Sequence, residues 1–220
     1  MNLPRPNPTE QVCSPAWWQL HWQTLVNILL YFILGEFTLR MTIKVVHAGH
    51  FDLLYWVATA KAIIGLWVIL IRRDYKEFDF RGLAQFVALA AFFSGVFFVK
   101  VPANSGIICT LGLWLLILGV VIVALSLVSL GPSFGVLIAR REVRTTYLFR
   151  WIRHPMYSAE LLKRVGVVML NSCWWNWILA IFSSALYVYR AELEEQFLKK
   201  SEEYRAYCEK IPCKFIPGLW

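Results

Sequence analysis

Long apolar stretches fill most of the first 130 residues of the chain. A helix needs about 20 mainly apolar residues to cross the hydrocarbon core of a bilayer. Four stretches meet this requirement, at residues 17–38, 51–71, 83–101 and 107–130. The last is the clearest, since it carries no charged residue. The pattern therefore predicts an all-α, polytopic membrane protein whose first part has four transmembrane helices.

Lys61 interrupts the second stretch near its middle. A charged side chain is costly in lipid, so it should face a neighbouring helix or a wet cavity. A long lysine side chain can also run along its helix and carry the ammonium towards the membrane surface. We favour packing or such snorkelling over a direct functional role.

The positions of lysine and arginine between the stretches predict the orientation. Cytoplasmic loops carry the excess of these residues. The loop after the second stretch and the loop after the fourth are rich in them: Arg72, Arg73, Lys76 and Arg81, then Arg140, Arg141, Arg144, Arg150 and Arg153. The other two loops hold only Arg40, Lys44 and Lys100. The second and fourth loops, and with them the N-terminus, are therefore expected in the cytoplasm.

A further uncharged run, from Val165 to Tyr189, has two interpretations. It is either a fifth span or a helical hairpin that turns within residues 171–176. A single span would carry the many basic residues after Tyr189 to the outside, against the rule, whereas a hairpin returns them to the cytoplasm. We favour the hairpin, with a second helix that continues into the charged segment 190–210 and a cytoplasmic C-terminus.

Composition agrees with a membrane setting. Of the 220 residues, 59% are hydrophobic and 16% charged, against about 25% charged in a typical soluble domain. The 11 tryptophans include two groups, Trp17–Trp18–Trp22 and Trp174–Trp175–Trp177, which suit the depth of lipid headgroups. The net charge of +8 fits anionic membrane lipids better than nucleic acid.

The ends and the cysteines add little chemistry. Residues 1–15 hold four prolines and one arginine, so they are expected to form an irregular leader and not a signal peptide. The five cysteines are scattered without metal-ligand spacing, so we expect no disulfide framework and no metal site. We divide the chain into a leader with a four-span scaffold, residues 1–130, and a catalytic region, residues 131–220.

Three clusters in the catalytic region carry candidate chemistry. The first is Arg153-His154-Pro155-Met156-Tyr157, the second contains Arg190, Glu194 and Glu195, and the third contains Tyr204 and Tyr207 before Ile211-Pro212 and Ile216-Pro217. Each is weak alone. A proline favours a first helical turn, paired glutamates are often a solvated helix face, and tyrosines three apart on a helix are often packing residues.

Together, the three clusters resemble the isoprenylcysteine carboxyl methyltransferase and phospholipid methyltransferase superfamily. The resemblance runs from residue 130 to residue 220 and begins with Leu130-Gly131-Pro132-Ser133-Phe134. It continues through the Arg-His-Pro-x-Tyr motif, Arg-x-x-x-Glu-Glu, Tyr-x-x-Tyr and the two Ile-Pro elements. The hairpin between the first two motifs is also what the family's fold implies.

The resemblance implies an S-adenosylmethionine-dependent methyltransferase whose cofactor pocket is formed by residues 149–160 and 190–207. Arg153 or Arg190 would donate two parallel hydrogen bonds to the cofactor carboxylate. Glu194 or Glu195 would accept a hydrogen bond from the cofactor ammonium or from a ribose hydroxyl. His154, Pro155, Tyr157, Tyr204 and Tyr207 would complete the cofactor site, with Arg153, Arg190 and Glu194 as catalytic residues. Methyl transfer mostly needs alignment and exclusion of water, so we assign no strong general base. The acceptor would be a lipophilic molecule, such as a prenylated cysteine carboxylate or a phospholipid amine, that enters sideways from the bilayer.

One departure from the family keeps two alternatives open. Where the family usually has Gly-Pro-Tyr, this chain has Tyr147-Leu148-Phe149, and a glycine permits a tight backbone conformation that tyrosine does not easily adopt. A non-catalytic relative with a decayed site is one alternative. The other is an NADPH-dependent membrane reductase of the sterol type, because such enzymes share a His-Pro-like turn, a Tyr-Cys pair and an Ile-Pro ending. The Arg190, Glu194 and Glu195 pattern favours the methyltransferase.

Overall fold

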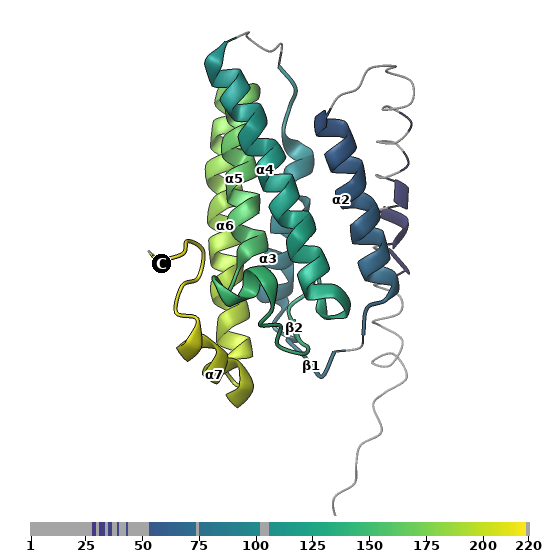
Figure 1. Ribbon diagram of the computed structural model, residues 1–220, viewed down its shortest axis with the longest axis vertical. Coiled ribbons are helices and arrows are strands. Elements are labelled where there is room, and N and C mark those ends of the chain that lie inside the picture. The colour runs from purple at the N-terminus through teal and green to yellow at the C-terminus, as the bar shows by residue number, and fades with distance from the viewer. Residues whose placement is uncertain are drawn as a thin grey trace, which may run out of the picture.

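In the computed structural model, the described part of the chain is a bundle of long helices with short elements at one end (Figure 1). The structure describes residues 53–73, 75–101 and 106–218, together with scattered helical positions between 28 and 43. The first expected span, residues 17–38, and the expected leader therefore lie largely or wholly outside the described residues.

Two helices precede the longest apolar helix. Helix α2 spans Leu53–Leu70, and α3 spans Gly82–Phe93 and continues as a 3₁₀ turn, η1, at Ser94–Phe97. The prediction placed these stretches at 51–71 and 83–101, so α3 ends earlier than expected. The reason is a contact from far along the chain: buried Asn176 binds the extended chain just after η1, donating to the Val99 carbonyl at 2.9 Å and accepting from its N–H at 3.1 Å.

Helix α4 spans Ile107–Leu130, as predicted, and the chain then makes a 3₁₀ turn, η2, at Gly131–Ser133. Within the described residues, Ile107–Ser133 is the helical stretch both long and apolar enough to cross a membrane, while the apolar parts of α2 and α3 are shorter. The mostly helical fold is thus confirmed, and four spans remain a prediction.

The region after α4 forms the expected helical hairpin. Helix α5 spans Pro155–Leu170 and α6 spans Trp174–Leu198, so the chain turns at residues 171–173. The two helices lie side by side (Figure 1). A last helix, α7, spans Glu202–Lys210 and begins with a Ser201 cap whose side chain accepts from the Tyr204 N–H. It lies at the end of the bundle where α5 begins and α6 ends (Figure 1).

Glycines bring α4 and α5 unusually close together. A Cβ added at Gly166 of α5 would lie 2.7 Å from both the Gly112 carbonyl oxygen and the Leu116 nitrogen of α4. Likewise, a Cβ at Gly112 would lie 2.7 Å from the Met169 Cβ. Small residues at such a contact let two helix backbones approach and gain van der Waals contact along their length. This contact fixes where the start of α5, and the site it carries, sits against the end of α4.

A short two-stranded element, which the sequence did not predict, ties two loops together at the same end of the bundle. Strand β1, Glu77–Phe78, pairs antiparallel with β2, Ala139–Arg140. The Gln85 side chain of α3 extends this contact by bonding the Ile138 N–H and carbonyl. A buried apolar cluster from α3, α6 and Ile138 lies alongside: Ala84, Val87, Ala88, Leu193 and Phe197.

Candidate functional site

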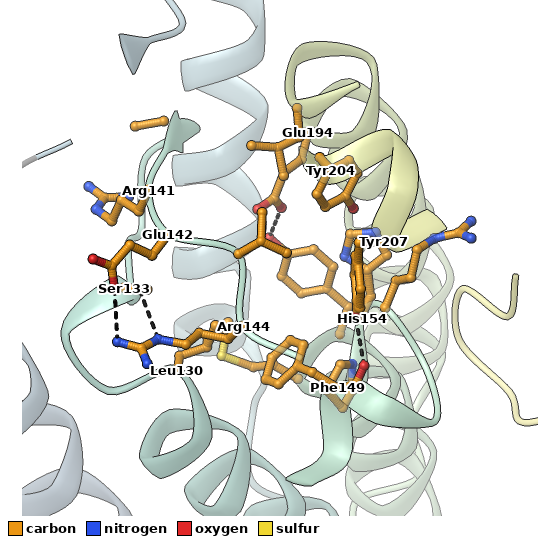
Figure 2. A pocket seen from close by; sticks show the side chains of 17 residues that line it. Leu130, Ser133, Arg141, Glu142, Arg144, Phe149, His154, Glu194, Tyr204 and Tyr207 are labelled. Atoms are coloured by element: carbon orange, nitrogen blue, oxygen red, sulfur yellow. Dashed lines mark hydrogen bonds and ion pairs between the residues drawn. The ribbon is translucent and has the colours of Figure 1, made fainter. Parts of the chain in front are cut away.

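A pocket opens at the end of the bundle where α4 ends, α5 begins and α7 lies (Figure 2). Its lining comes from α4, α5, α6 and α7 and from the loop between α4 and α5: Leu130, Ser133, Ala139, Arg141, Glu142, Val143, Arg144, Phe149, Arg153, His154, Pro155, Met156, Tyr157, Glu194, Leu198, Tyr204 and Tyr207. Seven of the nine site residues predicted from sequence are in this lining. Arg190 and Glu195 are the two outside it.

The Arg-His-Pro motif forms the turn into α5. Pro155 occupies the first helical position, where its missing N–H costs nothing and its fixed φ suits a helix start. The preceding N–H groups are bound elsewhere: Arg153 donates to the Cys213 carbonyl at 3.0 Å and His154 to the Lys214 carbonyl at 2.9 Å. The C-terminal segment is thereby fastened to the motif, which explains why the two occur together.

The buried carboxylate of Glu195, on α6, binds the residues of this turn and so attaches the turn to α6. The carboxylate accepts from Arg153 Nε at 2.7 Å, contacts His154 Nε2 at 3.1 Å and pairs with Lys199 Nζ at 2.9 Å. Because an ionised carboxylate only accepts, Nε2 of His154 carries the proton in this contact. Burial would raise the pKa of Glu195, but the hydrogen bonds from His154, Lys199 and Arg153 outweigh it and hold that pKa well below its usual range.

Most of the N–H groups of the Arg153 guanidinium bind protein acceptors. Besides Glu195, it donates from Nη1 to the carbonyls of Ile211 and Pro212, both at 2.8 Å. Its side chain is 7% exposed. Arg153 therefore touches the pocket while its polar atoms bind the Ile-Pro segment and Glu195.

Glu194, next to Glu195 in sequence, turns into the pocket instead. Its Oε2 accepts from the Tyr157 hydroxyl at 2.5 Å, and its other carboxylate oxygen accepts no hydrogen bond from the described residues. The Tyr157 ring in turn stacks on the His154 ring, with centroids 5.3 Å apart. A carboxylate with one free oxygen beside two stacked rings suits a cationic, hydrogen-bond-donating ligand.

The α7 tyrosines form an aromatic side of the pocket. Tyr204 and Tyr207 are buried, with ring centroids 5.7 Å apart, and the Tyr207 hydroxyl donates to the Phe149 carbonyl at 2.6 Å. Burial, together with the carboxylates of Glu195 and Glu194, raises the pKa of Tyr204 well above its usual range. Tyr204 is therefore a neutral phenol at physiological pH and keeps its proton as a donor.

The opposite side of the pocket was not anticipated as part of the site. Figure 2 shows Arg141, Glu142 and Arg144 on the side of the pocket opposite His154 and the two tyrosines. Arg144 donates from Nε to the Ser133 hydroxyl at 3.3 Å and from Nη2 to Glu142 at 3.2 Å. These arginines were interpreted only as markers of a cytoplasmic loop. The sequence feature that could have indicated their place in the pocket is the clustering of arginines shortly before the Arg-His-Pro motif.

Arg190 lies behind the pocket instead of lining it. Its guanidinium donates to the Ala88 carbonyl at 2.9 Å and to the Val136 carbonyl, and it lies over the Tyr157 ring at 5.2 Å from the centroid. These contacts join α3, α6 and the segment after α4. The geometry gives Arg190 a supporting position behind Tyr157, and its catalytic role stays a prediction.

Tyr147 adopts the backbone conformation that its side chain disfavours. Its φ is +52°, the one positive φ of a non-glycine residue in the described chain, at the start of the 3₁₀ helix η3, Tyr147–Arg150. The left-handed region costs an L-residue roughly 1–2 kcal/mol. The loop thus keeps the glycine-like backbone although the glycine itself is missing.

Comparison with known proteins identifies the part of the chain around this pocket. Residues 107–204 match the model of the phospholipid methyltransferase family. The match begins with α4 and ends at Tyr204, so it covers the Arg-His-Pro motif, both glutamates and one α7 tyrosine but neither α2 nor α3. No curated protein matches the chain.

Proposed function

We propose, from the phospholipid methyltransferase family to which residues 107–204 belong, that this protein transfers a methyl group from S-adenosylmethionine to a lipophilic acceptor. The family implies methyl transfer to lipid-like substrates at a membrane. The cofactor, the cytoplasmic position of its pocket, the multi-pass topology and the nature of the acceptor are our proposals. The acceptor is a phospholipid amine or a prenylated cysteine carboxylate.

The observation that carries the proposal is the pairing of Glu194 with an aromatic, arginine-rich pocket. S-adenosylmethionine has an ammonium, a carboxylate, ribose hydroxyls, an adenine and a cationic sulfonium. The lining supplies a complement for each: Glu194 for ammonium or hydroxyl, Arg144 for the carboxylate, and tyrosine rings for adenine and sulfonium. The residues present therefore fit this cofactor, which would supply an electrophilic methyl group.

The remaining motif residues position these groups. Arg153 and Glu195 fix the turn that carries His154 and Pro155, and the Arg190 guanidinium lies over the Tyr157 ring. Since methyl transfer is an in-line displacement, most of its acceleration comes from alignment and exclusion of water. The buried contacts of Arg153, Glu195 and Arg190 are suited to keeping the side chains that line the pocket in fixed positions.

The apolar exterior supports a bilayer setting for the acceptor. Large apolar side chains lie exposed along the outside of α4: Leu111, Trp114, Leu118, Val121, Leu125 and Val128. A soluble protein rarely exposes such a continuous apolar surface. In this proposal the acceptor reaches the pocket from lipid, between the helices, while the cofactor reaches it from the cytoplasm.

The test is calorimetric titration of the detergent-purified protein with S-adenosylmethionine, S-adenosylhomocysteine and NADPH. We expect both adenosyl compounds to bind. Glu194→Gln should weaken that binding by about tenfold or more, because it removes a charged hydrogen-bond partner while keeping an acceptor for Tyr157. Glu209→Gln, at an exposed position of α7, is the matched control and should bind as the unmodified protein does. Binding of NADPH alone would favour the reductase, and no binding at all would overturn the proposal.

A further inference from the structure

A short segment after α7 lies against the turn that begins α5. Residues 211–218 form no helix or strand, and the family match ends before them, at Tyr204. None of these residues lines the pocket. The segment is nevertheless held in one register by hydrogen bonds to the Arg-His-Pro turn.

Five consecutive carbonyl groups of this C-terminal segment accept hydrogen bonds from the start of α5: those of Ile211, Pro212, Cys213, Lys214 and Phe215. Arg153 donates to the first two through Nη1, both at 2.8 Å, and to the third through its backbone N–H at 3.0 Å. The His154 N–H donates to the fourth at 2.9 Å, and the Ser158 hydroxyl donates to the fifth at 2.6 Å. Backbone carbonyls that no helix or strand satisfies need such partners. Together, these bonds fix the position of the segment along the motif.

This register places one side chain of the segment inside the protein. Phe215 is 4% exposed, whereas the other residues of 211–218 are partly or largely exposed. The Phe215 ring centroid lies 5.8 Å from that of His154. The ring also belongs to a buried cluster with side chains from α3, α5 and α6: Ala91, Tyr157, Tyr187 and Ala191. Phe215 therefore packs against two residues that line the pocket, His154 and Tyr157, without lining it.

The two rings beside Phe215 hold the polar lining of the pocket. The His154 and Tyr157 rings are stacked, with centroids 5.3 Å apart and 8° between their planes. Nε2 of His154 is bound to Glu195, and the Tyr157 hydroxyl donates to Glu194. A stack of rings keeps its geometry when neighbouring side chains fill the space beside it, because a void removes van der Waals contacts. A shift of the stack would therefore also move the Glu194 carboxylate.

From these contacts we propose that Phe215 is a positioning residue of the cofactor site, acting through the His154–Tyr157 stack. The hydrogen bonds from the motif set the register of the C-terminal segment, and this register brings the Phe215 ring against the stack. The inference rests on the proposed function for its ligand, S-adenosylmethionine. It adds to the site a residue that lies outside the family match.

Calorimetric titration of the detergent-purified full chain with S-adenosylhomocysteine tests this inference. Phe215→Leu keeps a buried apolar side chain but removes the flat ring beside the stack. It should weaken binding by about fivefold, the effect of losing one aromatic pair. Phe215→Tyr keeps the ring and should retain most of the affinity. Ser158→Ala removes the hydroxyl that binds the Phe215 carbonyl and should weaken binding by about threefold.

Two control variants separate positioning from loss of stability. Val168 is buried near the opposite end of α5, and Val168→Ala removes at least as much buried side-chain volume as Phe215→Leu. Both variants should unfold at a lower temperature, but only Phe215→Leu should lose affinity. Ser126→Ala removes a buried hydroxyl that binds within α4 and should leave the affinity unchanged. Equal loss of affinity in Phe215→Leu and Val168→Ala, or unchanged affinity in Phe215→Leu, would overturn the inference.

Hydrogen–deuterium exchange without ligand keeps this result distinct from that of the proposed function. In Phe215→Leu, amides of residues 153–160 should exchange about fivefold faster than in the unmodified protein, because the support of the stack is lost. Amides of α4 should exchange at the unmodified rate. Unchanged exchange at residues 153–160 would overturn the role of Phe215. Failure of the unmodified protein to bind any adenosyl compound would reject the methyltransferase, whereas faster exchange would still show that Phe215 holds the two rings.

Discussion

At the scale of single residues, the strain at Tyr147 is the most direct consequence of the missing Gly-Pro-Tyr, which is usual in the family that this sequence resembles. A tyrosine at φ +52° carries a steric cost of about 1–2 kcal/mol that glycine does not. Its side chain is 72% exposed, so little packing is lost on replacement. The strain therefore comes from the backbone and not from the environment of the ring.

Tyr147→Gly should therefore maintain or raise stability. Relief of the left-handed strain outweighs or balances the extra unfolded-state entropy of glycine, which costs about 0.5–1 kcal/mol. Tyr147→Val should instead destabilise the protein, since a β-branched side chain tolerates this region least. Thermal unfolding of both variants in detergent is the measurement. A glycine variant that unfolds as early as the valine variant would show that the tyrosine ring, and not the backbone, matters here.

The sequence could indicate which residues form the site more easily than what each one does. Arg153 and Glu194 were both assigned to the cofactor from the motif. Both line the pocket, yet the Arg153 guanidinium donates hydrogen bonds to the Glu195 carboxylate and to the carbonyls of Ile211 and Pro212. Arg153 lies 42 or more residues along the sequence from each of its three partners, so no local pattern reveals them. The adjacent glutamates also differ: Glu194 points into the pocket, whereas Glu195 is buried in the core. The rotation of α6 about its axis determines which of the two reaches the pocket.

At the scale of elements, the apolar pattern predicted helices well and their ends less well. Helix α4 matches its prediction at both ends because its apolar run ends at Gly131, where φ is +49°. The end of α3 depends on Asn176, which belongs to a distant helix. The β1–β2 pair is only two residues on each side, and its pairing depends on loops brought together by the bundle.

The closest helix contact, between α4 and α5, should be intolerant of a single added methyl group. Gly166→Ala places a Cβ 2.7 Å from backbone atoms of α4, and backbone cannot rotate away as a side chain can. Forced separation of packed helices costs typically about 1–3 kcal/mol. We expect a lower unfolding temperature and weaker cofactor binding, because α5 carries His154 and Tyr157 with it.

Gly65→Ala provides the matched control for this contact. Gly65 is also helical and buried, but its added Cβ would meet only the Leu127 Cδ1 at 3.9 Å, an ordinary contact. Alanine is the better helix former by about 1 kcal/mol, so this variant should be as stable as the unmodified protein or more so. Equal destabilisation by both substitutions would argue against close packing as the cause.

At the scale of the whole molecule, the two ends of the bundle differ in chemistry. One end carries the pocket, α7 and most of the arginines. The other carries the turn at 171–173 and the exposed tryptophans Trp174, Trp175 and Trp177, which suit a lipid headgroup region. Because cytoplasmic loops carry the excess of lysine and arginine, we expect the pocket end of the bundle to face the cytoplasm and the tryptophan end to face the other side of the membrane.

The cysteines allow this orientation to be tested, because Cys173 lies in the turn between α5 and α6 while Cys213 lies beside the Arg-His-Pro turn at the opposite end. Both are partly exposed. Two single-cysteine variants, with the other cysteines replaced by serine, would be treated in intact spheroplasts with a membrane-impermeant maleimide. Cys173 should react from outside, and Cys213 only after permeabilisation. Labelling of both from the same side would contradict the hairpin topology, and labelling in the reverse order would place the pocket on the outer face. Either result would separate the fold, which the helix packing supports, from the orientation, which depends on charge alone.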